Sequence, residues 1–227
     1  TLIADADKRM PALALGTFLS KLDIKTDSVN IGQPAFFEKV NQLLRSTPLD
    51  AWKKYLAFHT IRNFAGALSS DFVQAQFDFS KAMTGQQSPK PRWERMVSRT
   101  DIQLGEALGQ LYVKKYFSET AKKRMLELVD NLQKAFAARI NKLDWMSDST
   151  KSKAKEKLAS FTKKIGYPDK WRDYSQVNIN PSDFFNNIIA LNENEFNFQK
   201  AKIGKPVDRT EWGMTPPTIN AYYSPIN

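Results

Sequence analysis

The chain has 227 residues and a mass of 26.0 kDa, and 41% of its residues are hydrophobic and 12% aromatic, which excludes disorder for most of it. It contains no Cys, which excludes disulfides, cysteine-zinc sites and thiol catalysis. The formal net charge of +10 suits three partners: a nucleic acid, an anionic surface or an acidic protein. Because Lys and Arg are mixed with Asp and Glu and no stacking or groove-reading motif accompanies them, we do not expect nucleic-acid binding.

The first third of the chain carries helical patterns. Residues 2–22 form an imperfect apolar stripe with helical spacing, which Pro11 interrupts. Pro34 suits the first position of a helix, because its fixed φ is helical and its missing N–H would have had no partner there. The Ser-Thr-Pro run at 46–48 indicates a cap and a first-turn proline for the next helix. A further helix is expected over residues 69–83.

The middle of the chain is also predicted to be helical. Residues 85–91 are rich in Gly, Ser and Pro and predict a loop, after which a helix begins at about Trp93. Ser118 suits the N-cap of the most regular helix, in which apolar residues recur at steps of three and four as far as Leu143. The serines within residues 147–149 are expected to cap another helix.

The helical pattern continues almost to residue 200. Residues 166–168, Gly-Tyr-Pro, are expected to end one helix, and residues 180–181, Asn-Pro, to begin the last one. We therefore predict a helical domain over residues 1–200, and a crossover with the start of a different domain over residues 201–227. No apolar run is long enough to span a bilayer. No signal peptide is visible, and we expect the native protein to begin upstream of Thr1.

The last twenty residues have a different character. The segment 218–223 is β-branched and aromatic and follows Pro216 and Pro217, so it predicts an extended strand at the edge of a sheet. An Asn side chain on such a strand can bind the backbone of a second extended chain whatever that chain's sequence. Asn220 is therefore a candidate peptide-binding residue, and the alternative is an ordinary polar residue of a strand.

Several segments resemble one protein family. The run PVDRTEWGMTPPTINAYY at 206–223 resembles the segment that leads into the active site of neprilysin-type zinc metallopeptidases, in particular the bacterial PepO-like branch. Further segments resemble the helical domain of that family, in the same order: GEALGQLY at 105–112, LDWM at 143–146 and IGYPDKW at 165–171. The resemblance covers nearly the whole chain. One departure is Met96, where many animal relatives carry a Cys.

The resemblance implies a fold: a mainly α, multi-helix domain that covers a cleft, followed by the first extended strand of a thermolysin-like α/β catalytic domain completed elsewhere. It implies a zinc-dependent endopeptidase or oligopeptidase, in which the side chain of Asn220 and the main chain of Ala221 bind the substrate backbone. The family binds zinc through an H-E-x-x-H helix and a further Glu, and these 227 residues do not contain that motif. We therefore expect no catalytic residue and no metal ligand in this chain.

The same resemblance implies partners and a compartment. The partners would be a peptide substrate and a complementary segment of the same protein that carries the zinc motif, and the chain alone would be inactive. The family favours the periplasm or the cell envelope over the cytoplasm. The competing hypothesis is a non-enzymatic helical interaction module, or an inactive fragment, that binds an acidic partner. Such a module would have a closed hydrophobic core and a disordered tail after Lys200.

Other notable residues have simpler interpretations. His59 is the single His and lies beside an apolar stripe, so a structural role is expected rather than metal binding. Gly105 and Gly109 are four residues apart, which indicates close packing of one helix on another. Asp208 and Arg209 are expected to form an ion pair that fixes the crossover.

Overall fold

The computed structural model describes residues 1–224. The chain divides into two compact units, and each unit contains two separate stretches of sequence. Unit 1 comprises Thr1–Lys90 and Asn178–Pro206, and unit 2 comprises Pro91–Val177 together with the described part of Val207–Asn227. The predicted division between residues 200 and 201 refers to domains of a longer protein and stays a prediction.

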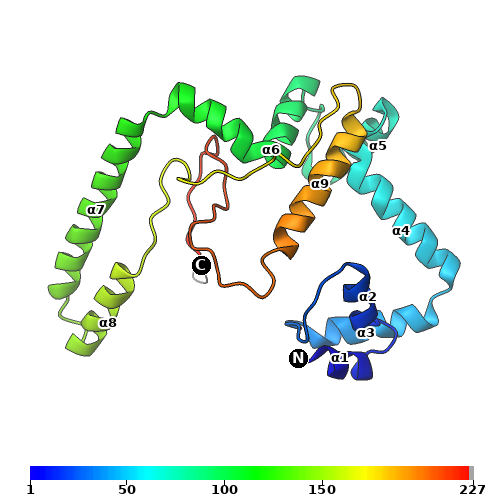
Figure 1. Ribbon diagram of the computed structural model, residues 1–227, viewed down its shortest axis with the longest axis horizontal. Coiled ribbons are helices and arrows are strands. Elements are labelled where there is room, and N and C mark those ends of the chain that lie inside the picture. The colour runs from blue at the N-terminus through cyan, green and yellow to red at the C-terminus, as the bar shows by residue number, and fades with distance from the viewer. Residues whose placement is uncertain (225–227) are drawn as a thin grey trace. The chain divides into compact units, whose positions relative to one another are not determined.

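Unit 1 is built from helices joined by short connections (Figure 1). They are α1 (Ile3–Arg9), α2 (Leu15–Lys21), α3 (Pro34–Ser46), α4 (Leu49–Phe64), a 3-10 turn (Ala65–Ala67), α5 (Ser70–Thr84) and α9 (Phe184–Lys200). The predicted helices of the first third are therefore confirmed, and α3 begins at Pro34 as expected. Among the described residues, one β-bridge, between Leu2 and Ser28, joins the start of the chain to the loop that follows α2.

Two helix starts differ from the prediction. Pro48 occupies the N-cap position of α4 rather than its first turn, and no side chain caps that end. The last helix starts at Phe184 and not at residues 180–181, because Asp183 provides the cap by accepting a 3.1 Å hydrogen bond from the amide of Asn186.

The core of unit 1 combines small and large apolar side chains with one buried amide. Ala65, next to the end of α4, is buried, as are Ile188 and Leu191 of α9. Near the other end of the unit, buried Asn41 of α3 accepts a 2.8 Å hydrogen bond from the amide of Ala12. This bond satisfies a backbone donor between α1 and α2, where Pro11 interrupts the helical pattern.

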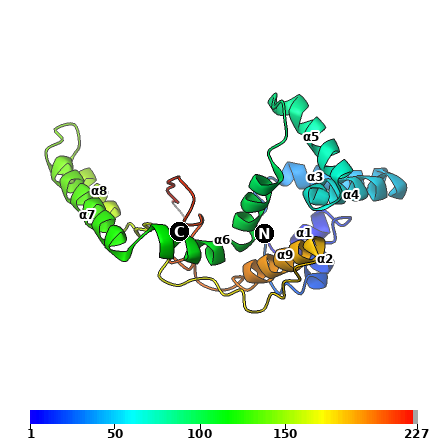
Figure 2. The ribbon, with the colours of Figure 1, turned by 90° about the horizontal axis from the view of Figure 1, so that it is seen from above.

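Unit 2 contains α6 (Arg92–Tyr116), α7 (Glu119–Asn141) and α8 (Asp148–Ala159). Helices α7 and α8 lie side by side as a hairpin in both views (Figures 1 and 2). The predicted caps are confirmed: Ser118 accepts from the amide of Ala121 at 3.2 Å, and Ser147 accepts from that of Thr150 at 3.3 Å. Helix α6 bends at Leu104, whose φ of −128° and ψ of 29° are not helical.

Helix α8 is shorter than predicted: it ends at Ala159 and not at residues 166–168. The residues from 160 to 177 form an irregular connection that returns along the unit (Figure 1). The mainly α class is confirmed.

The predicted strand over residues 218–223 is not formed in the structure. The amide of Asn220 donates a 3.2 Å hydrogen bond to the carbonyl of Thr218, and this bond closes a short turn instead of extending the backbone. A strand is stabilised by backbone hydrogen bonds to another strand, and within residues 1–224 no strand lies beside this segment. The tail, defined here as residues 207–224, is therefore ordered by contacts of another kind.

Candidate functional site

The tail is attached to α6 through Thr215 and Pro216. The Thr215 hydroxyl donates a 2.8 Å hydrogen bond to Oδ1 of Asp101, and it also lies 3.0 Å from the hydroxyl of Thr218. The bond between Thr215 and Asp101 connects residues 114 positions apart in sequence. Local patterns gave no indication of the contact, although a Thr before two prolines marks a point where the backbone is restricted.

Two buried glycines of α6, Gly105 and Gly109, provide the space for this attachment. We call this pair the notch. A Cβ added to Gly105 would lie 2.1 Å from Cγ2 of Thr215, and one added to Gly109 would lie 2.7 Å from Cδ of Pro216. Real Cβ atoms do not approach so closely, so the tail can lie here only because both residues lack a side chain. The predicted packing of one helix on another at these glycines is wrong: the groups that approach them belong to the tail and, at Gly109, also to Trp171.

Further contacts hold the tail on both sides of Thr215. Nζ of Lys164 donates a hydrogen bond to the carbonyl of Glu211. The amide of Gly213 donates a 3.1 Å bond to the hydroxyl of Tyr222, which folds the end of the tail back on itself. The tail is thus ordered within unit 2, in contrast to the disorder that a simple interaction module would show.

Asn220 and Ala221, the predicted peptide-binding residues, are both exposed. The amide of Ala221 donates a 2.8 Å hydrogen bond to Oδ1 of Asn220. The predicted donor and acceptor groups are therefore accessible, and in this state they bind each other. A peptide backbone could replace this local bond at little net cost, because one hydrogen bond would be exchanged for another.

The predicted ion pair between Asp208 and Arg209 is replaced by a local turn. In the described part of the tail, the Asp208 carboxylate accepts hydrogen bonds from the hydroxyl of Thr210 at 2.7 Å and from its amide at 2.8 Å. Both bonds lower the pKa of Asp208, the bond from the Thr210 hydroxyl more than the bond from its amide, and nearby lysines lower it further. Asp208 therefore shapes the start of the tail and is ionised at neutral pH.

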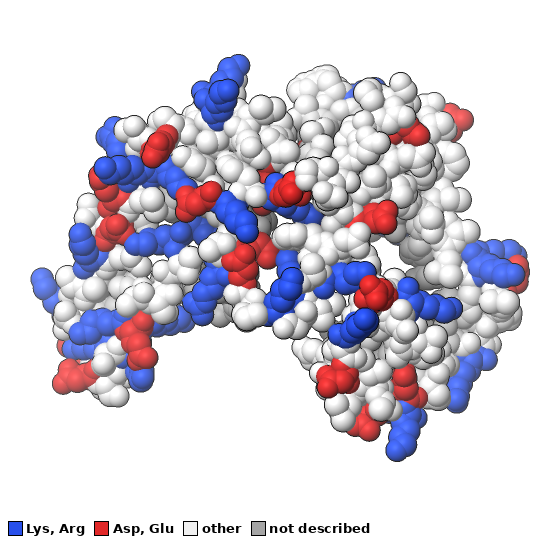
Figure 3. All heavy atoms as spheres, in the orientation of Figure 1, with Lys and Arg blue, Asp and Glu red and all other residues white. Residues whose placement is uncertain are grey.

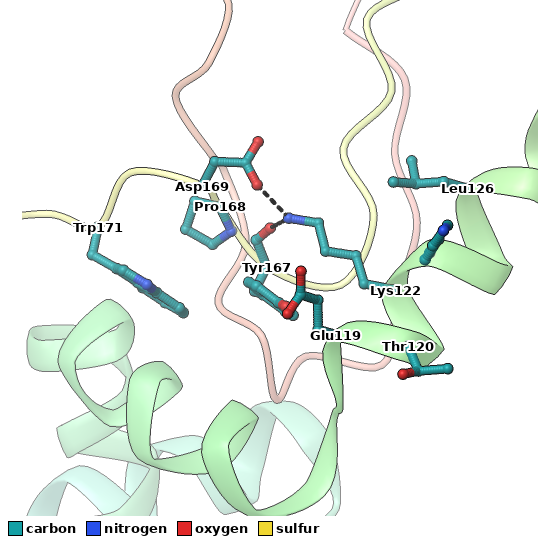
Figure 4. A pocket seen from close by; sticks show the side chains of 9 residues that line it. Glu119, Thr120, Lys122, Leu126, Tyr167, Pro168, Asp169 and Trp171 are labelled. Carbon is teal, nitrogen blue, oxygen red and sulfur yellow. Dashed lines mark hydrogen bonds and ion pairs between the residues drawn. The ribbon is translucent and has the colours of Figure 1, made fainter.

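A pocket of about 710 Å³ lies beside α7, next to the GYPDKW turn (Figure 4). Lys122 is its central cation, and Nζ donates to the carbonyl of Tyr167 at 2.7 Å and to Oδ1 of Asp169 at 2.6 Å. Nζ also lies 4.1 Å from the centre of the Tyr167 ring, which stacks on Trp171. Because Lys122 already binds this turn, we interpret the arrangement as a clamp that attaches the turn to α7.

The residues present do not form a zinc site. Within residues 1–224, no group of three or more His, Cys, Asp or Glu side chains lies close enough together to hold a metal ion. His59 of α4 packs against the ring of Tyr55, with ring centres 4.3 Å apart, and against that of Phe58 at 5.4 Å. This aromatic packing agrees with the structural role expected for His59.

The surface charge does not form a continuous basic patch on the face that Figure 3 shows. Over α7 and α8, at the left of that view, Lys and Arg side chains are interspersed with Asp and Glu. Ion pairs such as Lys163–Asp130 and Lys153–Glu156 account for part of this mixing. Among the described helices, none has the length and apolar composition needed to cross a membrane.

Comparisons with known proteins give a consistent picture. The family model of peptidase family M13 matches residues 1–168. Neprilysin-2 of Drosophila melanogaster is 31% identical over 88% of this chain, and endothelin-converting enzyme 1 of Bos taurus is 31% identical over 93% of it. The crystal structure of the Mycobacterium tuberculosis zinc metalloprotease Zmp1 in complex with an inhibitor matches 85% of this chain with a TM-score of 0.78 and a sequence identity of 40%. The chain spans only 28% to 29% of the length of these three proteins.

Proposed function

Because the chain belongs to peptidase family M13, we propose that it is the helical lobe and the peptide-binding segment of a zinc-dependent endopeptidase or oligopeptidase. The observation that carries this proposal is the match of most of the chain to that family, together with 40% identity to a solved zinc metalloprotease. By the same family relationship, we propose that the protein works in the periplasm or the cell envelope.

The zinc of this family requires ligands that the described residues do not provide. We propose that the ligands lie on a further segment of the complete protein, which continues this chain or binds to it as a complementary piece. In that case, zinc analysis of the complete protein should find about one zinc per molecule, and the 227-residue chain alone should bind none. A complete protein without zinc that still cleaves peptides would contradict this assignment.

The role proposed for Asn220 and Ala221 is to hold the main chain of the substrate. An amide side chain offers donors and an acceptor, and a neighbouring backbone offers one of each, so the pair can bind a peptide without reading its side chains. Holding the substrate in this way lowers the entropy that must be lost on reaching the transition state. The exposure of both residues, and the anchoring of the tail before them, support this role.

The test is the substitution Asn220→Ala in the complete protein, with hydrolysis of a fluorogenic peptide as the assay. We expect kcat/KM to fall about 10- to 100-fold, because one or two hydrogen bonds to the peptide are lost while the chemistry is unchanged. The matched control is Asn197→Ala, which truncates an equally exposed Asn on α9. Equal kcat/KM values for Asn220→Ala and the control would refute the role of Asn220.

The competing function, a helical module that binds an acidic partner, predicts no peptidase activity in the complete protein. It also predicts that the residues after Lys200 do not fold against the rest of the chain. The hydrogen bonds of Glu211 to Lys164 and of Thr215 to Asp101 hold the tail against other parts of unit 2, and they favour the peptidase.

A further inference from the structure

We propose that α6 positions the peptide-binding segment, and that Asp101, Gly105 and Gly109 are its positioning residues. This inference rests on the proposed function of Asn220 and Ala221, but the attachment of the tail to the notch can be tested independently of activity. None of the three residues would touch the substrate. They would act by fixing the place from which the last residues of the tail extend.

Two adjacent tail residues, Thr215 and Pro216, are fixed by two different kinds of contact. Thr215 is held by a directional bond, from its hydroxyl to Asp101, and Pro216 is held by shape against Gly109. A hydrogen bond sets the orientation of the tail, and close packing sets its distance from α6. Although α6 bends at Leu104, residues on both sides of the bend contact the tail.

Neither Thr215 nor Pro216 can adapt to a larger residue at position 105 or 109 without losing a contact or moving its backbone. If Thr215 rotated about χ1 to avoid a methyl group at position 105, its hydroxyl would move away from Asp101 and from Thr218. The ring of Pro216 has no such rotation, so a methyl group at position 109 must displace the backbone. In both cases the change at α6 is transmitted to the main chain of the tail.

Only a few residues of chain separate the notch contacts from the predicted binding residues. Asn220 follows Pro216 by four residues, and Pro217 between them restricts the backbone further. Displacement of Thr215 or Pro216 therefore moves Asn220, and a misplacement of about 1 Å can lower an enzymatic rate roughly 100-fold.

The first experiment measures hydrogen exchange on the 227-residue chain. Three tail amides, those of Gly213, Thr218 and Asn220, donate hydrogen bonds within the tail. In Gly105→Ala we expect their exchange to be about tenfold faster, because overpacking weakens the attachment. The double variant Gly105→Ala/Thr215→Ser should restore slow exchange, because Ser keeps the hydroxyl for Asp101 and lacks the methyl group that lies 2.1 Å away. Gly32→Ala, with open space around its Cβ, is the matched control.

The second experiment measures peptide hydrolysis by the complete protein with the same variants. We expect Gly105→Ala to lower kcat/KM about tenfold with unchanged zinc content, and the double variant to recover most of that loss. A purely structural role would lower the fraction of folded enzyme instead, which reduces kcat in proportion and leaves KM unchanged.

The possible results separate the two proposals. If Gly105→Ala leaves both exchange and kcat/KM unchanged, or if Thr215→Ser gives no recovery, the positioning proposal is wrong. If Gly105→Ala loosens the tail, and neither it nor Asn220→Ala changes kcat/KM, then the attachment to the notch stands and the peptide-binding role fails. Faster exchange together with a rescued loss of kcat/KM supports both.

Discussion

The substitution Gly166→Ala tests how the IGYPDKW segment is held in unit 2. Gly166 has a φ of +77°, in the left-handed region that residues with a side chain rarely adopt. An added Cβ would also lie 2.5 Å from Cε1 of Phe117, at the end of α6. The Phe117 ring packs edge-on against Tyr167, with centres 6.0 Å apart, so it cannot withdraw without disturbing that contact.

The expected magnitude follows from three contributions. The left-handed conformation costs about 1–2 kcal/mol for Ala, and overpacking against Phe117 costs about 1–3 kcal/mol more. Ala also reduces the freedom of the unfolded chain, which stabilises the protein by roughly 0.4–1 kcal/mol. We therefore expect Gly166→Ala to lower the free energy of unfolding of the chain by about 1–4.5 kcal/mol.

The assay is urea unfolding of the 227-residue chain followed by circular dichroism, with two glycines of unit 1 as controls for the effect of φ and of the space around Cβ. Gly204 has a φ of +74° and open space around its Cβ, so Gly204→Ala should cost only about 1 kcal/mol. Gly32 has open space and no positive φ, so Gly32→Ala should be neutral or stabilise by about 0.5 kcal/mol. If Gly166→Ala costs no more than Gly204→Ala, the contact with Phe117 contributes nothing and the reasoning is refuted.

Three further substitutions test other contacts. Lys122→Met should lower the free energy of unfolding by about 1–3 kcal/mol, because it leaves the Tyr167 carbonyl without its hydrogen-bond donor. Chemical denaturation measures this change, and Lys123→Met, at an exposed position, is the control. Asn41→Ala should cost a similar amount, about 1–3 kcal/mol, by leaving a backbone amide unpaired inside unit 1, and a change below 0.5 kcal/mol would contradict this. Asn186 donates two hydrogen bonds to the Asp183 carboxylate, one from its side-chain amide and one from its backbone amide, and these bonds, the side-chain one first, lower the pKa of Asp183. The stability that the ionised Asp183 contributes is therefore fully present above the ordinary pKa of 3.8, and it is lost as the pH falls through the lower pKa of the folded state. The difference in Tm between wild type and Asp183→Ala should therefore be present at pH 7 and vanish in acid.

The parts of the fold that the sequence predicted correctly depend on short-range chemistry. Ser118 and Ser147 were expected to cap helices, and each accepts a bond from an amide three residues later. The Pro34 start of α3 rests on the fixed φ of a single residue. Such signals work because all the participating atoms lie within one turn of the chain.

One error, the predicted start of the last helix, occurs where two local signals compete. A helix could begin at the Asn180-Pro181 pair or at Asp183. The structure has Asp183 as the N-cap. Asn180 is engaged elsewhere: its amide donates to Oδ1 of Asn187 at 2.8 Å, and its carbonyl accepts from Nδ2 of the same residue. Composition cannot show which candidate will be occupied by a side chain seven residues away.

The candidate site depends on a contact that local patterns do not report. The resemblance predicts a peptide-binding role for Asn220 and Ala221, and the spacing of Gly105 and Gly109 predicted packing against another helix. The link between the two features is a contact over 114 residues, through Thr215, and no periodicity reports such a contact. Only the folded chain shows that the packing at the glycines and the peptide-binding candidates belong to one arrangement.

This arrangement has an energetic consequence for peptide binding. Fixing the backbone of a residue costs about 1–2 kcal/mol, so a tail that became ordered only when it bound a peptide would lose much of its affinity. In this chain Thr215 and Pro216 are already fixed against α6, and Gly213 is bonded to Tyr222. Only the few residues around Asn220 then have to exchange their local hydrogen bonds for bonds to the peptide. Under the proposed function, the helical unit therefore contributes to peptide affinity by ordering the tail in advance, without contacting the substrate.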